Sequence, residues 1–174
     1  MDVSDFKTHD WLKVGGGAVF LIAGFLPWLQ ISGFGFSVSA NAFDFFFTGT
    51  VPWLIFVAIG VLTFLAAAKI FSLPETMPVP TIFLGAAALG TLLVIIRFFD
   101  TEGGLDRGIG LFLALIAAIV VTAGAYMAFT ESGGNLAELG KNLQSKTSSG
   151  AKSDDAPPPP PPAEEQPPPP PPAN

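Results

Sequence analysis

The sequence predicts an all-α protein: an antiparallel four-helix transmembrane bundle followed by a disordered polyproline tail. Four apolar runs, at about 12–30, 51–72, 80–99 and 108–129, each approach the ~20 residues that a helix needs to cross the hydrocarbon of a bilayer. Charged residues make up only 13% of the chain, about half of the usual share in globular domains. No acidic residue lies in the middle of a run.

The residue types that the sequence lacks exclude several kinds of chemistry. There is no cysteine, which excludes disulfides, thiol catalysis and iron–sulfur ligation by cysteine. His9 is the one histidine in the sequence, and a single histidine excludes a multi-histidine metal site. No nucleophile–base pair and no clustered basic sequence emerges, so we expect neither an enzyme nor a nucleic-acid-binding protein. No metal or cofactor is expected.

The first apolar run, 12–30, is predicted to be an uncleaved signal-anchor helix inside a transmembrane domain that covers 11–130. The preceding polar segment, 1–10, is rich in aspartate, and no Ala-x-Ala-like cleavage site follows the run. Trp11 and Lys13 stand where an aromatic belt residue and an interfacial cation are expected.

The longest connection between the predicted helices is 31–50, which contains six phenylalanines, no Lys or Arg, and the single acid Asp44. Residues 34–39 alternate large apolar and small side chains, and this period of two predicts a short strand or an extended turn. Residues 41–44 are predicted to interrupt the regular secondary structure before an interfacial aromatic segment. We expect the whole connection to fold back over the helix ends at the depth of the lipid headgroups.

The remaining helices carry signals of their ends and of their packing. Pro52 is suited to the first turn of the second helix, and Lys69 near its end can extend to the interface. The short connector 73–79 makes the second and third helices antiparallel neighbours. Small residues favour close helix packing, with a hinge or a pore lining as the alternative for the third helix; the candidates are Gly85, Ala86, Gly90, Ala114 and Ala118.

A charged cluster surrounds the loop between the third and fourth helices, and Asp44 could join it. One interpretation is a vestibule for an ion or substrate, because ionisable groups at membrane depth are costly. The other is that Arg97 reaches the interface and pairs with Asp100 three residues later. The second is favoured, because an ion path needs ionisable groups in mid-helix. The cluster consists of Arg97, Asp100, Asp106 and Arg107.

The placement of Lys and Arg predicts a multi-pass protein of the plasma membrane with both termini in the cytoplasm. This orientation leaves only Arg97 and Arg107 outside. It keeps six lysines inside: Lys7, Lys13, Lys69, Lys141, Lys146 and Lys152.

Two polar segments follow the last predicted helix. Residues 131–148 are a juxtamembrane linker in which Leu136, Leu139 and Leu143 fall on one helical face; an amphipathic helix on the inner leaflet and a frayed linker both remain open. Residues 149–174 form the disordered tail, which acts either as a spacer or as a docking arm for a cytoplasmic protein. Its two blocks of six prolines predict stiff polyproline II rods. The first block runs from Pro157 to Pro162 and the second from Pro167 to Pro172.

Four segments carry a further indication: GFLPWLQISGFGFSVSANAFDFF, PWLIFVAIGVLTFLA, VIIRFFD and RGIGLFLALIAAIVVTAGAYM. Through them the chain resembles, over about residues 11–130, small uncharacterised actinobacterial four-helix (tetraspan) integral membrane proteins with a proline-rich cytoplasmic tail. The resemblance implies a location in the cell envelope of a Gram-positive host. It implies no activity and no functional residue.

Two functions are compatible with these patterns. The preferred one is a non-enzymatic accessory or scaffold protein of the cell envelope, whose partners are the lipid bilayer and a cytoplasmic protein bound by the tail. The alternative is an oligomeric pore, a holin-like protein or a transporter component. The alternative requires several copies of the chain, because the helices supply few polar groups beyond Thr63, Thr91 and Thr122.

Overall fold

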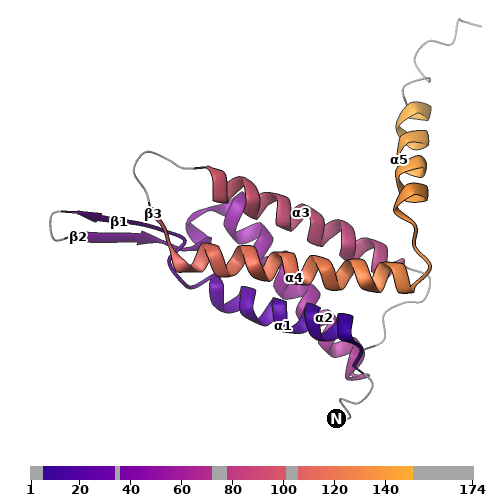
Figure 1. Ribbon diagram of the computed structural model, residues 1–174, viewed down its shortest axis with the longest axis horizontal. Helices are drawn as coiled ribbons and strands as arrows, with labels where there is room; N and C mark the ends of the chain where they lie inside the picture. The colour runs from indigo at the N-terminus through magenta and orange to yellow at the C-terminus, as the bar shows by residue number, and fades with distance from the viewer. Residues whose placement is uncertain (1–5, 34–35, 72–77, 101–105, 151–174) are drawn as a thin grey trace, which may run out of the picture. The chain divides into compact units, whose positions relative to one another are not determined.

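The computed structural model describes residues 6–33, 36–71, 78–100 and 106–150. Four helices lie side by side as an up-and-down bundle in which α1 and α3 each pack between α2 and α4 (Figure 1). A fifth helix, α5, belongs to a second unit that begins at Leu136 and is described by itself. The helices are α1 (Thr8–Ala23), α2 (Val51–Ala67), α3 (Val79–Phe99), α4 (Ile109–Glu131) and α5 (Leu136–Gly150).

Three helical segments are long and apolar enough to cross a membrane. They are Phe46–Ala67, Val79–Phe99 and Ile109–Glu131, with 22, 21 and 23 residues. At 1.5 Å per residue each is about 30 Å long or slightly more, which matches the hydrocarbon thickness of a bilayer. These helices indicate a membrane protein.

The first predicted helix, 12–30, differs from α1 at both ends. The helix begins earlier, at Thr8, where the backbone N–H of Lys7 donates to the Asp10 carboxylate at 3.3 Å and caps the first turn. It ends at Ala23, because Pro27 cannot continue the hydrogen-bond ladder. With 16 residues α1 is about 24 Å long, and it is not among the three spans.

A small antiparallel sheet, which was not expected in an all-α fold, lies at one end of the bundle. Strands β1 (Leu29–Gly33) and β2 (Phe36–Ala40) form a hairpin, and β3 (Asp106–Arg107) pairs with the other edge of β1. The hairpin projects beyond the helix ends (Figure 1). The period of two in 34–39 is therefore a strand signal for 36–39, whereas 34 and 35 lie outside the described residues.

The remainder of the predicted loop turns back to the bundle. A 3-10 turn, η1 (Ala42–Asp44), is followed by a π-helical turn, η2 (Phe46–Thr50), that runs directly into α2. The backbone N–H of Ala42 donates to the carbonyl of Gly24 at 3.2 Å, which ties η1 to the end of α1. The connection therefore consists of a projecting hairpin and two helical turns, in which Phe46 and Phe47 are exposed.

Large apolar side chains fill the interior of the bundle. The Phe20 and Phe56 rings meet between α1 and α2 with their centroids 4.6 Å apart. Trp28 is buried at the end of the bundle from which the hairpin projects, and its indole N–H donates to the Ala23 carbonyl at 2.8 Å. Fully buried residues from all four helices complete this core: Phe20, Ala23, Phe56, Ala87, Val94, Leu111, Ala114, Ala118, Val121 and Ala125.

The predicted packing residues lie in different surroundings. Ala114 and Ala118 are fully buried, and Ala86 packs against the core. Gly90 is buried where a Cβ would come within 2.9 Å of the Phe56 ring. Gly85 takes no part in this packing, because it is exposed and a Cβ there would meet no described atom within 4 Å.

A close approach of two helix backbones involves glycines outside that predicted set. A Cβ on Gly17 would lie 2.9 Å from the Cα of Gly60 and 3.0 Å from the carbonyl oxygen of Phe56. The backbones of α1 and α2 are therefore in contact at this crossing. Small residues allow this kind of approach between membrane helices.

Candidate functional site

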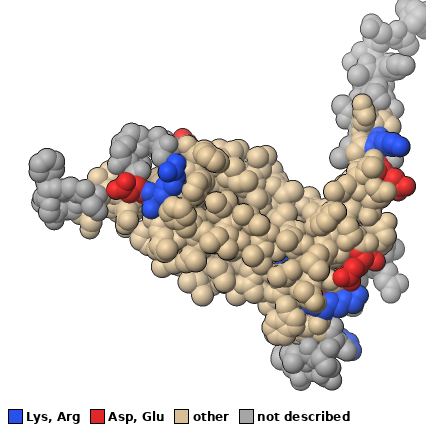
Figure 2. Space-filling model, in the orientation of Figure 1, with Lys and Arg blue, Asp and Glu red and all other residues tan. Residues whose placement is uncertain are grey.

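Charged side chains lie at the two ends of the bundle, and the surface between them is uncharged on the face that Figure 2 shows. One end, the hairpin end, carries the β strands and the predicted charge cluster. The opposite end contains the beginning of α1 and the end of α4, which meet through Lys7 and Glu131. We call it the charged end.

At the hairpin end the structure brings Arg97 and Asp100 together. The Arg97 Nη1 atom lies 3.2 Å from Asp100 Oδ2, and the guanidinium carbon lies 3.6 Å from the centre of the Phe45 ring. Only 3% of Arg97 is exposed, so this arginine lies inside the protein, and its Nε and Nη2 atoms are buried without a hydrogen-bond partner among the described residues. Stacking on an aromatic face is favourable for a guanidinium.

The other members of the predicted cluster have separate local contacts. Arg107 donates from Nε to the Phe98 carbonyl at 2.8 Å and lies over the Phe98 ring. Asp106 is exposed on β3. Asp44 accepts a 2.7 Å hydrogen bond from the backbone of Asn41 and so caps η1. These contacts do not form a common vestibule.

At the charged end a chain of ionisable groups joins α1 to α4. Glu131, the last residue of α4, lies 3.2 Å from Lys7 Nζ and 3.2 Å from His9 Nδ1. The opposite ring nitrogen, His9 Nε2, lies 3.4 Å from Asp10 Oδ1, and Lys13 Nζ lies 3.1 Å from that same oxygen. The imidazole therefore stands between two carboxylates from different helices.

Lys13 points into the bundle, which corrects its predicted role as an interfacial cation. Only 6% of it is exposed, and 8% of His9. Both residues belong to the stripe of buried α1 positions that continues through Gly16, Phe20 and Ala23 at spacings of four and three. Gly124 on α4 leaves room for the lysine, because a Cβ there would lie 3.2 Å from Lys13 Cγ.

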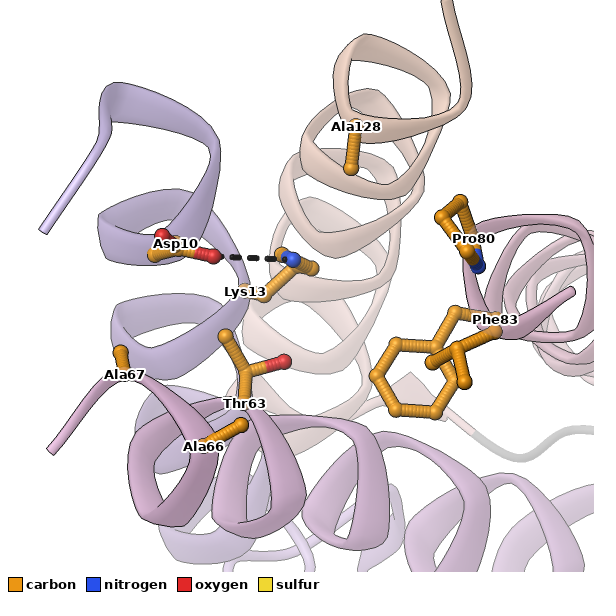
Figure 3. Close-up of a pocket in the computed structure, with 9 residues that line it drawn as sticks. Asp10, Lys13, Thr63, Ala66, Ala67, Pro80, Phe83 and Ala128 are labelled. Atoms are coloured by element: carbon orange, nitrogen blue, oxygen red, sulfur yellow. Dashed lines mark ion pairs between the residues drawn. The ribbon is translucent and has the colours of Figure 1, made fainter. Parts of the chain in front are cut away.

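A pocket of about 220 Å³ opens beside this ion pair, and all four bundle helices line it (Figure 3). Asp10 and Lys13 come from α1, Thr63 from α2, Phe83 from α3 and Ala128 from α4. The Thr63 hydroxyl is directed into the space between Lys13 and Phe83 (Figure 3). It is buried, and no described residue forms a hydrogen bond with it. Buried hydroxyls ordinarily have one.

The two other threonines considered in the sequence analysis connect helices. Thr91 on α3 and Thr122 on α4 have their hydroxyl oxygens 2.8 Å apart. The Thr122 hydroxyl also lies 3.3 Å from the Ala87 carbonyl, and the Thr91 hydroxyl 3.4 Å from the Ala118 carbonyl. Hydrogen bonds between membrane helices of this kind contribute roughly 0.6 to 2 kcal/mol.

The pocket could not be predicted from local sequence patterns, because residues from four helices that are distant in sequence line it. The sequence does contain a signal that His9 and Lys13 are buried, because the two residues continue the spacing of the apolar stripe of α1. The tail residues Pro157, Pro162, Pro167 and Pro172 lie outside the described residues. Within the part of the chain that the structure describes, no group of three or more His, Cys, Asp or Glu side chains could hold a metal ion.

Comparisons of the chain with protein-family models, with curated proteins and with solved structures found no match.

Proposed function

We propose that this chain is a non-enzymatic accessory or scaffold protein of the plasma membrane in the cell envelope. The bundle anchors the protein. The β1–β2 hairpin is presented on the outer side, and α5 and the proline-rich tail lie in the cytoplasm, where the tail is a spacer or a docking arm.

The filled interior of the bundle is the observation that carries this proposal. A conduit through a single copy needs a polar or open path along the bundle axis. The centre instead contains the buried side chains of Phe20, Phe56, Leu111 and Val121, and Thr91 and Thr122 are engaged with each other. A closed bundle suits an anchor better than a channel.

The packing of α1 supports its role as a fourth membrane-spanning helix, although it has only 16 residues. It lies antiparallel along α4, since Lys7 and His9 at its beginning meet Glu131 at the end of α4. The beginning of α4 meets the chain just after α1, where Gly110 donates to the Pro27 carbonyl at 2.9 Å. If α4 crosses the bilayer, the two ends of α1 lie on opposite sides.

Reconstituted liposomes distinguish the anchor from the alternative, a pore or transporter component. We expect liposomes that contain the chain to retain an entrapped dye and a potassium gradient as well as protein-free liposomes do. Leakage that increases with the number of chains per liposome would contradict the anchor and favour an oligomeric pore.

Deletion of residues 156–174 is expected to leave membrane insertion and the thermal stability of the bundle unchanged. The deleted segment has no apolar face to bury. The measurement is membrane fractionation together with the unfolding temperature in detergent, with the full chain as control. Loss of membrane-inserted protein after the deletion would contradict the prediction.

Crosslinking in cells, with the full chain and with the same deletion, tests the role of the tail. A cytoplasmic protein captured only by the full chain would make the tail a docking arm. Identical captures dominated by crosslinks between copies of the chain would make the tail a spacer and favour the oligomeric pore.

A further inference from the structure

Two polar side chains in the wall of the pocket at the charged end, Lys13 and Thr63, can donate hydrogen bonds to a ligand. An ammonium group carries three N–H donors, and Asp10 Oδ1 lies 3.1 Å from the Lys13 ammonium. That carboxylate is already occupied, because Oδ1 also faces His9 Nε2 and Oδ2 accepts from the backbone of Lys7. The Thr63 hydroxyl has no hydrogen-bond partner within the part of the chain that the structure describes. A ligand with acceptor oxygens suits both donors.

The rest of the pocket wall is apolar, which indicates what else the ligand carries. Phe83 and Pro80 from α3 and Ala66 from α2 face the same space as Lys13 and Thr63 (Figure 3). A small, fully hydrated anion gains nothing from such a wall. An acidic group attached to an apolar body matches both parts of it, because the apolar body removes wall surface from water.

The position of the pocket along the bundle points to the source of the ligand. Lys13 lies near the beginning of α1, and Ala128 lies within one turn of the end of α4. In a bundle whose helices cross the bilayer, this level is the depth of the lipid headgroups. We propose that the pocket binds the acidic phosphate headgroup of a membrane lipid, whose oxygens accept hydrogen bonds from Lys13 and Thr63.

Native mass spectrometry of the full chain in a neutral detergent tests this proposal. The probes are dioctanoylphosphatidylglycerol, dioctanoylphosphatidylcholine and inorganic phosphate. We expect one phosphatidylglycerol per chain, bound at least about tenfold more tightly than phosphatidylcholine, because the choline cation offsets the phosphate charge that Lys13 would bind. Equal binding of the two lipids would overturn the proposal. Binding of inorganic phosphate as tight as that of phosphatidylglycerol would overturn the lipid as the source.

Two variants locate the binding in this pocket. Thr63→Val keeps the side-chain shape and removes the hydroxyl, so we expect it to weaken phosphatidylglycerol binding about tenfold, the typical effect of one hydrogen bond to a charged acceptor. Ala128→Leu fills the pocket and is expected to weaken binding by about tenfold or more. The matched controls are Thr130→Val and Ala123→Leu, whose parent residues are exposed on α4.

The unfolding temperature shows whether each variant keeps its fold. Thr63→Val removes an unpartnered buried hydroxyl, so it is expected to unfold at the temperature of the parent chain or above. Folded Thr63→Val and Ala128→Leu variants that bind phosphatidylglycerol as the parent does would overturn the proposal. Loss of binding in the two control variants would do the same, because it would place the lipid elsewhere on α4.

Discussion

Replacing Gly17 with leucine is expected to lower the free energy of unfolding of the bundle by about 3 kcal/mol or more. The added Cβ would lie 2.9 Å from the Cα of Gly60, and this atom belongs to the backbone of α2 and cannot rotate away. The helices must therefore separate. Separation also opens the contact between the Phe20 and Phe56 rings, which lies further along the same two helices.

The measurement is unfolding in mixed micelles of a neutral detergent and dodecyl sulfate, followed by far-ultraviolet circular dichroism. The matched control is Gly15→Leu, two residues away on the exposed face of α1, where a Cβ would meet no described atom within 4 Å. This control should gain up to about 1 kcal/mol, because leucine has the higher helix propensity. If the two variants unfold alike, α1 and α2 do not cross at Gly17.

Replacing Trp28 with alanine is expected to lower the free energy of unfolding by about 3 to 5 kcal/mol. The indole is fully buried, meets the Phe20 ring edge to face, and donates to the Ala23 carbonyl at 2.8 Å. Its backbone N–H donates to Ala40 and its carbonyl accepts from Gly108. The side chain therefore stabilises the point at which α1, the hairpin and α4 meet.

Trp11→Ala is the control for this substitution, because 53% of Trp11 is exposed. We expect a much smaller loss of stability in the same mixed-micelle titration. Trp28→Phe separates the two contributions, since it retains an aromatic ring and loses the hydrogen bond, which is worth about 1 kcal/mol. Equal effects of Trp28→Ala and Trp11→Ala would show that Trp28 is not part of the core.

The helices α2, α3 and α4 could be predicted because their signal is local. A long apolar run constrains the backbone to satisfy its own hydrogen bonds, and the predicted bounds differ from the observed ones by a few residues. The end of α2 is the largest of these differences. The helix stops at Ala67 because Lys69 adopts a left-handed conformation with φ of 57°, and the sequence has no glycine there to indicate it.

The hairpin end was predicted less well because its structure depends on distant contacts. Leu29 pairs with Ala40 in β2 and with Arg107 in β3, and the second partner is remote in sequence. No local pattern predicts that pairing. The apolar run that ends at residue 30 predicts a helix there, although Pro27 interrupts it.

The candidate sites differ in the same way. Asp100 directly follows α3 and stands three residues after Arg97, so the spacing alone suggests the contact. The contact between His9 and Glu131 joins residues 122 positions apart. Only the packing of α1 against α4 brings these side chains together, and the pocket beside them exists because four helices meet there.

The accessibility of single cysteines tests the central claim, a four-span anchor that presents its hairpin on one side and α5 on the other. The chain has no native cysteine, so Thr8→Cys, Ser39→Cys and Gln144→Cys each carry one thiol, at exposed positions on α1, β2 and α5. A membrane-impermeant maleimide applied to intact cells should label Ser39→Cys alone, and it should label the other two only after the membrane is opened. Labelling of Thr8→Cys and Ser39→Cys from the same side would contradict the account, because α1 would then not cross the membrane.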